Sequence, residues 1–290
     1  MDGAGVEDHR LLRGRDTRLR ILDDVKTAVE CESNVGRIVS VMIGDTAEVA
    51  VYIRGQARAA AQVGIPFDEQ VWDASVTQDE CKKRIQAMND DPDVLGVILQ
   101  RPVPDHINVR SLQSAIHPLK DIEGMNPASI GNIVYNDVAL APCTAAAAVE
   151  LIHATGLTMQ GLEVVMIGHS EIVGKPIAMM LMAEGATVTV CHHMTRSVAM
   201  HSRRADVVVV AVGVAHLVGK DMIKPGAAVI DIGINQTDTG IVGDVNTDEV
   251  LDIAGWITPV PGGVGPVTTA ILMRNAMVAL KRQKAAGWLG

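Results

Sequence analysis

Short apolar runs alternate with helical stretches along the whole chain, and this alternation constrains the fold more than any other feature. Runs with the length and β-branched content of buried strands lie at 37–44, 69–74, 94–100, 162–168, 186–192, 206–213 and 227–233. Segments with helical periodicity lie at 9–31, 46–63, 77–89, 108–116, 144–155, 172–185, 198–204 and from about 267 to 285. This order is typical of βαβ units whose parallel sheet is covered on both faces. The sequence therefore predicts an α/β fold.

The length of 290 residues exceeds that of most single domains, so we expect two. The boundary fits best near "ALAPCTAAAAVE" (139–150), where an X-Pro step precedes a new alanine-rich helix. Residues 142–265 then form a Rossmann-type domain, and residues 1–141 with 266–290 form the other. The last helix is too apolar along one stripe to stand alone, so it is predicted to pack on the first domain.

Composition excludes several classes of partner. The chain is 48% apolar and 20% charged, as expected for a folded protein, and its net charge of −9 argues against nucleic acid or an anionic membrane as the main partner. Its longest apolar run, 207–215, is shorter than the roughly 20 residues that cross a bilayer. The N-terminal residues lack the apolar segment of a signal peptide, so a cytoplasmic location is expected. The four cysteines form no CxxC pair, which argues against a zinc knuckle or a disulfide framework.

The segment "VVMIGHSEIVGKP" (164–176) is typical of a buried strand, a tight glycine turn and a helix start. In that setting backbone N–H groups and the helix dipole hold a pyrophosphate. The spacing of Gly168, Ser170 and Gly174 is not GxGxxG, so an ordinary strand–turn–helix connection is the alternative.

Histidines follow the next predicted strand. A dinucleotide fold often places an acid there for NAD or a basic group for NADP, whereas this chain has His192 and His193. His169, in the glycine turn, and Arg196 are further candidates for the ribose. Adjacent histidines at a strand end are more often surface residues than ligands, and their spacing matches no metal motif, so no metal site is predicted.

A second glycine-rich segment, "WITPVPGGVGPVTTA" (256–270), contains three prolines and three glycines. Such a loop is stiff and lets a flat ligand approach the backbone closely. A rigid connection between domains explains the same residues equally well.

Tyr52 is one of two tyrosines in the chain, and Gln56 lies one helical turn beyond it in "VYIRGQARAAA" (51–61). The spacing places both side chains on one helix face. The pattern alone favours a core position, because a packed tyrosine with a satisfied hydroxyl is common.

Together, several segments resemble one family, the bifunctional methylenetetrahydrofolate dehydrogenase/cyclohydrolases of the FolD type. The similarity runs from about residue 36 to 275. It rests on "GVILQRPVPDHIN" (96–108), "HPLKDIEGMNPASIG" (117–131), "APCT" (141–144), "IGHSEIVGKP" (167–176), "VIDIGIN" (229–235), "GDV" (243–245) and "TPVPGGVGPVTTAIL" (258–272). The last of these, with the GxSxIVGKP turn, is highly specific.

The resemblance implies a homodimeric enzyme that binds folate and nicotinamide between its two domains. Such enzymes oxidise 5,10-methylenetetrahydrofolate by hydride transfer to NAD(P) and hydrolyse the methenyl product to 10-formyltetrahydrofolate. By this similarity Tyr52 flanks the pterin, Gln100 bonds near the reacting centre, and Asp121 lies beside the pterin-binding acid, Glu123. Pro261 and Gly262 line the substrate site. The cofactor-binding residues implied are Gly168, His169, Ser170, Ile172, Gly174, His193 and Ile234.

Three departures from the family pattern bear on activity. The family has YxxxK where this chain has Gln56, and an amide cannot titrate near neutral pH, so we predict that cyclohydrolase activity is lost or very weak. The family's KDxDG reads "KDIEG" (120–124), which moves the acid by about one methylene. His169 and His193 replace an arginine and a small polar residue near the adenosine 2′-phosphate, so NAD and NADP are both open.

Two other functions remain as alternatives. One is a non-redox transferase that passes the methylene group of methylenetetrahydrofolate to an acceptor entering where the lysine is missing. The other is a catalytically silent folate-binding protein. The retained glycine turn and the PGGVGP loop argue against the silent protein, which has no need of a cofactor site.

Overall fold

The computed structural model describes residues 9–44, 47–238 and 240–288. By its internal contacts the chain divides into two compact units. We call residues 19–143 with 269–288 the first unit, and residues 9–18 with 144–268 the second unit. Each is built on a parallel sheet, which confirms the predicted α/β class.

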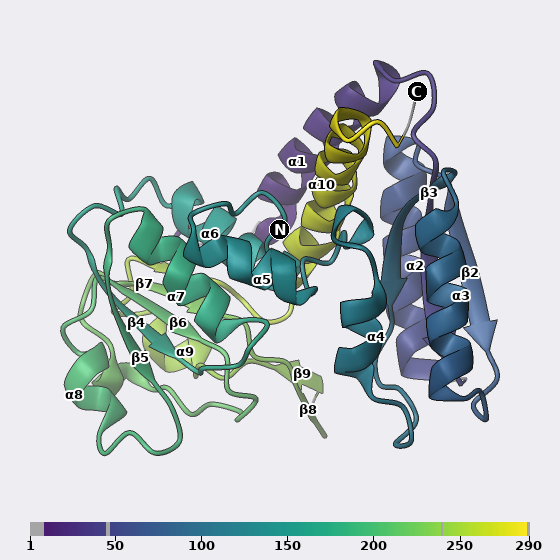
Figure 1. The fold of residues 1–290 in the computed structure, drawn as a ribbon. Coiled ribbons are helices and arrows are strands. Elements are labelled where there is room, and N and C mark those ends of the chain that lie inside the picture. Colours follow the sequence, from purple (N-terminus) through teal and green to yellow (C-terminus); the bar gives the residue numbers. More distant parts are fainter. Residues whose placement is uncertain (1–8, 45–46, 239, 289–290) are drawn as a thin grey trace, which may run out of the picture. The chain divides into compact units, whose positions relative to one another are not determined.

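The first unit contains a three-stranded parallel sheet in the order β2-β1-β3 (Figure 1). Its elements are α1 (Gly14–Glu30, from Leu19 on), β1 (Arg37–Ile43), α2 (Ala47–Val63), β2 (Phe67–Trp72), α3 (Gln78–Asp90), β3 (Val94–Leu99), α4 (Val109–Ala115), the 3-10 turn η1 (Pro118–Lys120), α5 (Pro127–Val134) and part of α10 (Val264–Ala285).

Both faces of this sheet are covered. Val41 and Ile43 of β1 belong to a core cluster with residues of α3 and α4, whereas Met42 packs with Val49 and Ile53 of α2. Because neighbouring strand residues point to opposite faces, α2 covers one face and α3 and α4 the other. Burial on both faces explains why β1 is a continuous apolar run rather than an alternating one.

The C-terminal part of α10 belongs to the first unit, as predicted. The Asn275 amide donates to the carbonyls of Ile122 (3.0 Å) and Ala141 (3.1 Å). One turn from the helix end, Gln283 donates to the carbonyls of Leu95 (2.7 Å) and Leu119 (2.9 Å). Two buried amides thus fix this helix to segments that lie more than a hundred residues earlier in the chain.

The second unit contains a five-stranded parallel sheet in the order β10-β7-β6-β4-β5. Its elements are α6 (Cys143–Ala154), β4 (Glu163–Ile167), α7 (Gly174–Ala183), β5 (Thr187–Cys191), α8 (Val198–Ser202), β6 (Val207–Val210), η2 (Lys220–Met222), β7 (Ala228–Asp231), the hairpin β8 (Asn235–Thr237) and β9 (Gly240–Val242), α9 (Thr247–Val250), β10 (Trp256–Ile257) and the start of α10. This arrangement confirms the Rossmann-type prediction.

The N-terminal segment differs from the prediction. The helix expected from residue 9 begins at Gly14, because the preceding residues run beside β10: the Leu12 N–H donates to the Ile257 carbonyl (2.8 Å), and the Ile257 N–H to that of Arg10 (2.9 Å). Residues 9–18 therefore group with the second unit rather than with the first.

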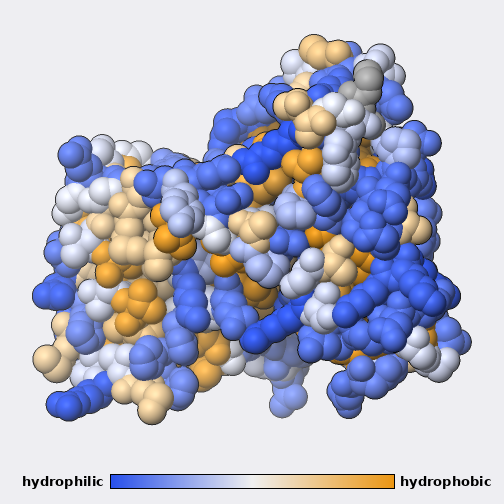
Figure 2. Space-filling view, viewed as in Figure 1, coloured by the Kyte–Doolittle hydropathy of each residue, from blue (hydrophilic) through white to orange (hydrophobic). Residues whose placement is uncertain are grey.

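The surface shows where polar residues gather. In Figure 2 the visible side of α3 is mostly hydrophilic, in keeping with a helix whose buried residues are Cys81, Ile85, Met88 and Asn89. Over the described residues, no helix combines the length and apolarity that spanning a membrane requires.

We expect Asn275→Ala to destabilise the protein. The substitution removes both amide hydrogen bonds and leaves the buried Ala141 carbonyl without this donor, which costs about 1–3 kcal/mol. Urea unfolding followed by circular dichroism measures the loss, with the exposed Lys281→Ala of the same helix as control. Equal midpoints for the two variants would contradict this role of Asn275.

Candidate functional site

The predicted folate-site residues come together at the carboxyl end of the sheet in the first unit. Tyr52 and Gln56 lie on α2, which follows β1, and Gln100 directly follows β3. Asp121 and Glu123 follow η1, and the Leu99 N–H donates to the Glu123 carboxylate (3.0 Å). The ends of parallel strands thus gather residues from four separate segments.

Two buried amides form the inner part of this cluster. Gln100 Nε2 donates to Gln56 Oε1 (2.7 Å) and to the hydroxyl of Ser40 on β1 (2.9 Å). Gln56 is only 2% exposed, whereas Tyr52, on the same helix face, is 50% exposed. Of these two residues of α2, Gln56 is therefore buried, and Tyr52 is open to a ligand. Neither amide titrates near neutral pH.

The charged residues of "KDIEG" have different tasks. Lys120 is buried, and its ammonium donates to the carbonyls of Met88 (2.8 Å) and Asp91 (2.5 Å) at the end of α3. The Asp121 carboxylate accepts from the N–H groups of Met125 (3.0 Å) and Asn126 (2.7 Å) and from the Ser129 hydroxyl (2.6 Å). Both side chains are occupied in holding the loop that carries Glu123.

The ionisation of Glu123 is shifted toward neutral pH. Desolvation raises the pKa of its carboxyl to about 7, and the nearby Asp121 adds to the rise. The Leu99 N–H and the charge of Arg101 act in the opposite direction and only partly offset it. Oε2 accepts from the Leu99 N–H, so Glu123 titrates near neutral pH while held against the end of β3.

Cys143 is a member of the cluster that the sequence did not predict as a site residue. Its buried thiol donates to the Ile122 carbonyl (3.6 Å) and accepts from the Asn275 amide (3.6 Å). Burial raises the pKa of Cys143 well above its ordinary value, and desolvation raises the pKa of Tyr52 to about 12, with Cys143 and Glu123 adding to the shift. The "APCT" segment carried the signal for Cys143, but a lone cysteine has no informative spacing.

In the second unit the predicted glycine turn follows β4 and leads into α7. A Cβ at Gly168, whose φ is +120°, would lie 2.2 Å from the Ala211 carbonyl oxygen. A Cβ at Gly174 would lie 2.2 Å from the Gly168 carbonyl oxygen. The Ser170 hydroxyl accepts from the Gly174 N–H (3.3 Å) at the start of α7. Glycine is therefore required at both positions, and the turn has the form that cradles a pyrophosphate.

The other predicted ligand-binding residues of the second unit lie on loops. Ile172 is half-buried within the glycine turn, and Ile234 is 70% exposed just before β8. Pro261 is exposed, and Gly262, with a φ of +106°, accepts from the Gly14 N–H (2.9 Å) through its carbonyl. Exposure leaves Ile234 and Pro261 accessible to a ligand.

A buried pair of carboxylates organises the strand ends of this unit and was not predicted. Asp244 accepts from three successive N–H groups, those of residues 212–214, at 2.7–3.0 Å. Asp231 accepts from the N–H groups of Gly233, Asp244 and Val245 at 2.9–3.1 Å. Desolvation raises the pKa of Asp231 to about 6. The segments "VIDIGIN" and "GDV" contain these acids, but only the fold shows that they meet.

The three histidines suggested for the cofactor ribose also meet. The His169 ring centroid lies 4.8 Å from that of His192 and 6.0 Å from that of His193. His169 and His193 are exposed and His192 is half-buried. The sequence suggested all three near the ribose, but separations of 23 and 24 residues gave no sign that their rings lie this close to one another.

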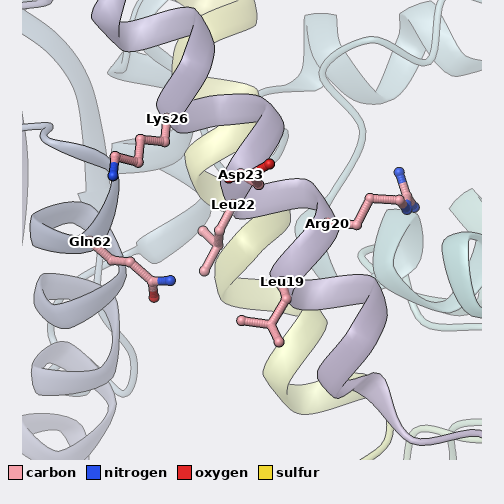
Figure 3. Close-up of a pocket in the computed structure, with 6 residues that line it drawn as sticks. All are labelled: Leu19, Arg20, Leu22, Asp23, Lys26 and Gln62. Atoms are coloured by element: carbon pink, nitrogen blue, oxygen red, sulfur yellow. The ribbon is translucent and has the colours of Figure 1, made fainter.

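A pocket of about 450 Å³ lies elsewhere in the first unit, between α1 and α2. Figure 3 shows Leu22 and Lys26 of α1 extending toward α2, and Gln62 of α2 extending toward α1. The other lining residues are Leu19, Arg20 and Asp23. It contains none of the predicted site residues.

Comparison with known proteins shows the family of the chain. The sequence model "Tetrahydrofolate dehydrogenase/cyclohydrolase, catalytic domain" matches residues 12–123, and "Tetrahydrofolate dehydrogenase/cyclohydrolase, NAD(P)-binding domain" matches residues 142–284. The chain belongs to the tetrahydrofolate dehydrogenase/cyclohydrolase family. It is 74% identical to the bifunctional protein FolD 3 of Roseobacter denitrificans over 288 residues, which cover 98% of this chain and 99% of that protein.

Solved structures of family members are also similar. The FolD enzyme of Campylobacter jejuni is 34% identical, with a TM-score of 0.91 over 94% of this chain and 99% of that one. The FolD of Trypanosoma brucei, solved with NADP and an inhibitor, is 33% identical, with a TM-score of 0.88 over 94% and 98% of the two chains. The amide pair and Glu123 lie in the part that matches the family's catalytic domain, and the glycine turn lies in the part that matches its NAD(P)-binding domain.

We expect Gly174→Ala to weaken binding of both NAD and NADP roughly tenfold or more, because the added Cβ must push away the Gly168 carbonyl and open the turn. Isothermal titration with each nucleotide measures the effect. Gly131→Ala, where a Cβ meets nothing within 4 Å, is the control. A well-folded Gly174→Ala protein with unchanged affinity would show that the turn does not hold the cofactor.

Proposed function

We propose that this chain oxidises 5,10-methylenetetrahydrofolate by hydride transfer to NAD(P), and that its hydrolysis of the methenyl product is weak or absent. Family membership and the glycine turn support the dehydrogenase. The observation that carries the second part is the buried pair of Gln56 and Gln100, in which one neutral amide donates to the other.

The hydride step makes modest demands on the protein. The iminium-like product is stabilised by its own nitrogens, so the enzyme mainly has to align two rings. In the first unit, the half-exposed ring of Tyr52 offers a stacking surface, and Glu123 offers a carboxylate oxygen for pterin N–H groups. Gln100, held by Gln56 and Ser40, has a fixed orientation beside them.

The hydrolytic step demands more, because water must lose protons as it adds to the methenyl carbon. The pKa of Tyr52 is about 12 and that of Cys143 lies well above its ordinary value, so both stay protonated at neutral pH. Glu123 titrates near neutrality, but we assign it to binding the pterin. A positioned acid–base group is worth about 10² to 10⁴ in rate, and the amide at position 56 supplies none of it.

For the cofactor we propose either NAD or NADP, the latter held through histidines. NADP carries a 2′-phosphate that the imidazoles of His169 and His193 can contact as hydrogen-bond donors, whereas NAD carries none. We also propose that the protein acts as a homodimer, as its family resemblance implies, which sedimentation velocity tests directly.

The central experiment supplies methylenetetrahydrofolate with NAD or NADP and follows reduced nicotinamide and the methenyl product by absorbance. Reduction of either nucleotide supports the proposal. If the protein binds folate but reduces neither, the dehydrogenase assignment is wrong, and methylene transfer or silent folate binding takes its place. If the methenyl product is hydrolysed no faster than without enzyme, the loss of cyclohydrolase activity is supported.

Gln56→Lys is expected to increase hydrolysis of methenyltetrahydrofolate by about 10² or more, because it places a titrating amine beside Gln100. Stopped-flow absorbance of the methenyl chromophore measures the rate. Gln62→Lys, which adds the same charge on an exposed turn of α2, is the control. If wild type already hydrolyses as fast as Gln56→Lys, position 56 does not limit this step.

The pH profile of dehydrogenation tests Glu123. Its pKa is raised to about 7, so the carboxylate that accepts from the pterin forms as pH rises, and kcat/KM should increase through about pH 7 and then level off. In Glu123→Gln we expect a lower kcat/KM and no inflection there. The exposed Glu80→Gln should keep the wild-type profile. An unchanged inflection in Glu123→Gln would assign the titration to another group.

A further inference from the structure

The backbone of the second unit brings three imidazoles to one edge of its sheet. Strands β4 and β5 are parallel, with Ile167 opposite Cys191, and the Gly168 N–H donates to the Cys191 carbonyl (2.8 Å). His169 lies two residues beyond the end of β4, and His192 and His193 directly follow β5. The register of β4 and β5 therefore places the backbones of the three histidines close together, whatever the orientation of their side chains.

We propose that His169, His192 and His193 bind one divalent transition-metal ion of the zinc class. One ring nitrogen of each histidine lies within 4.8 Å of those of the other two. A tetrahedral zinc ion with Zn–N bonds of about 2.0–2.1 Å holds its ligand nitrogens roughly 3.3 Å apart, so the cluster must contract by at most about 1.5 Å. His169 and His193 are exposed, and rotation about their side-chain bonds supplies this movement.

The choice of ion follows from the ligands. Neutral imidazole suits zinc, copper, nickel and iron, whereas magnesium and calcium prefer oxygen. Three imidazoles leave one tetrahedral position open, as in zinc sites that accept water or a further ligand. A dinucleotide fold places the adenine ribose near this edge, so an ion here adds positive charge close to the cofactor.

One existing hydrogen bond opposes the ion. His192 Nδ1 accepts from the Met194 N–H (3.2 Å), and either coordination through Nδ1 or the reversed tautomer breaks that bond. The loss of one neutral hydrogen bond corresponds to about a fivefold loss in affinity, which three nitrogen ligands outweigh. The His192 backbone N–H keeps its own bond to the Thr195 hydroxyl (2.9 Å), so the turn persists.

The test uses the full chain without an affinity tag. Zn²⁺ is titrated calorimetrically, and Co²⁺ serves as a spectroscopic probe, because its visible absorption reports tetrahedral coordination. We expect one ion per chain, and at least about tenfold weaker binding in His169→Ala and in His193→Ala. The control is His201→Gln, which removes an imidazole of the same unit that lies outside the cluster. Circular dichroism verifies that each variant is folded.

Three results would overturn the proposal. They are no zinc binding by wild type, unchanged binding in His169→Ala and His193→Ala, and an equal loss of binding in His201→Gln. A parallel titration with inorganic phosphate tests the alternative that the three histidines form an anion site. Phosphate binding that is lost in the histidine variants, together with no zinc binding, identifies such a site instead. The titrations contain no folate or nicotinamide, so their outcome is independent of the proposed dehydrogenase activity.

Discussion

In each unit, one central strand has neighbours on both sides that come later in the chain, and this constraint determines where ligands can bind. Strand β1 lies between β2 and β3, and β4 lies between β5 and β6. The chain leaves the central strand toward one side of the sheet and later continues on its other side. The carboxyl end of the central strand therefore lies at the point where the strand order reverses, which is where parallel sheets leave room for a ligand. The amide pair with Glu123 lies at this end in the first unit, and the glycine turn lies there in the second.

Buried acids at these strand ends differ in how fully their oxygens are bonded, and this difference separates scaffold from site. Asp121 and Asp231 each accept hydrogen bonds from three residues of the surrounding segments. Their carboxylates hold the backbone together and have little capacity for a ligand. The Glu123 carboxylate accepts from the Leu99 N–H, and its pKa rises to about 7 because desolvation is less compensated. An acid left in this condition is the one suited to recognising a substrate.

The sequence predicted those features that depend on local pattern. The long strands and helices, the return of the last helix and the glycines at 168 and 174 all follow from periodicity or turn chemistry. Short elements such as β8, β9 and β10 lacked enough residues for a pattern, although Asn126 followed by Pro127 was a usable signal for the start of α5. The pairing of Asp231 with Asp244 and the short distances between the histidine rings depend on how segments far apart in the chain meet, which no local pattern contains.

Gln56 and Glu123 are best understood together. Oε2 of Glu123 bonds to the N–H of Leu99, the residue before Gln100, whose amide bonds to Gln56. A lysine at position 56 would place an ammonium two contacts from the carboxylate and lower its pKa, because an opposite charge favours the ionised form. With an amide there, nothing at position 56 offsets the desolvation of Glu123. A lysine introduced at position 56 would therefore have two linked effects: it would add a titrating group to the buried pair, and it would lower the pKa of Glu123.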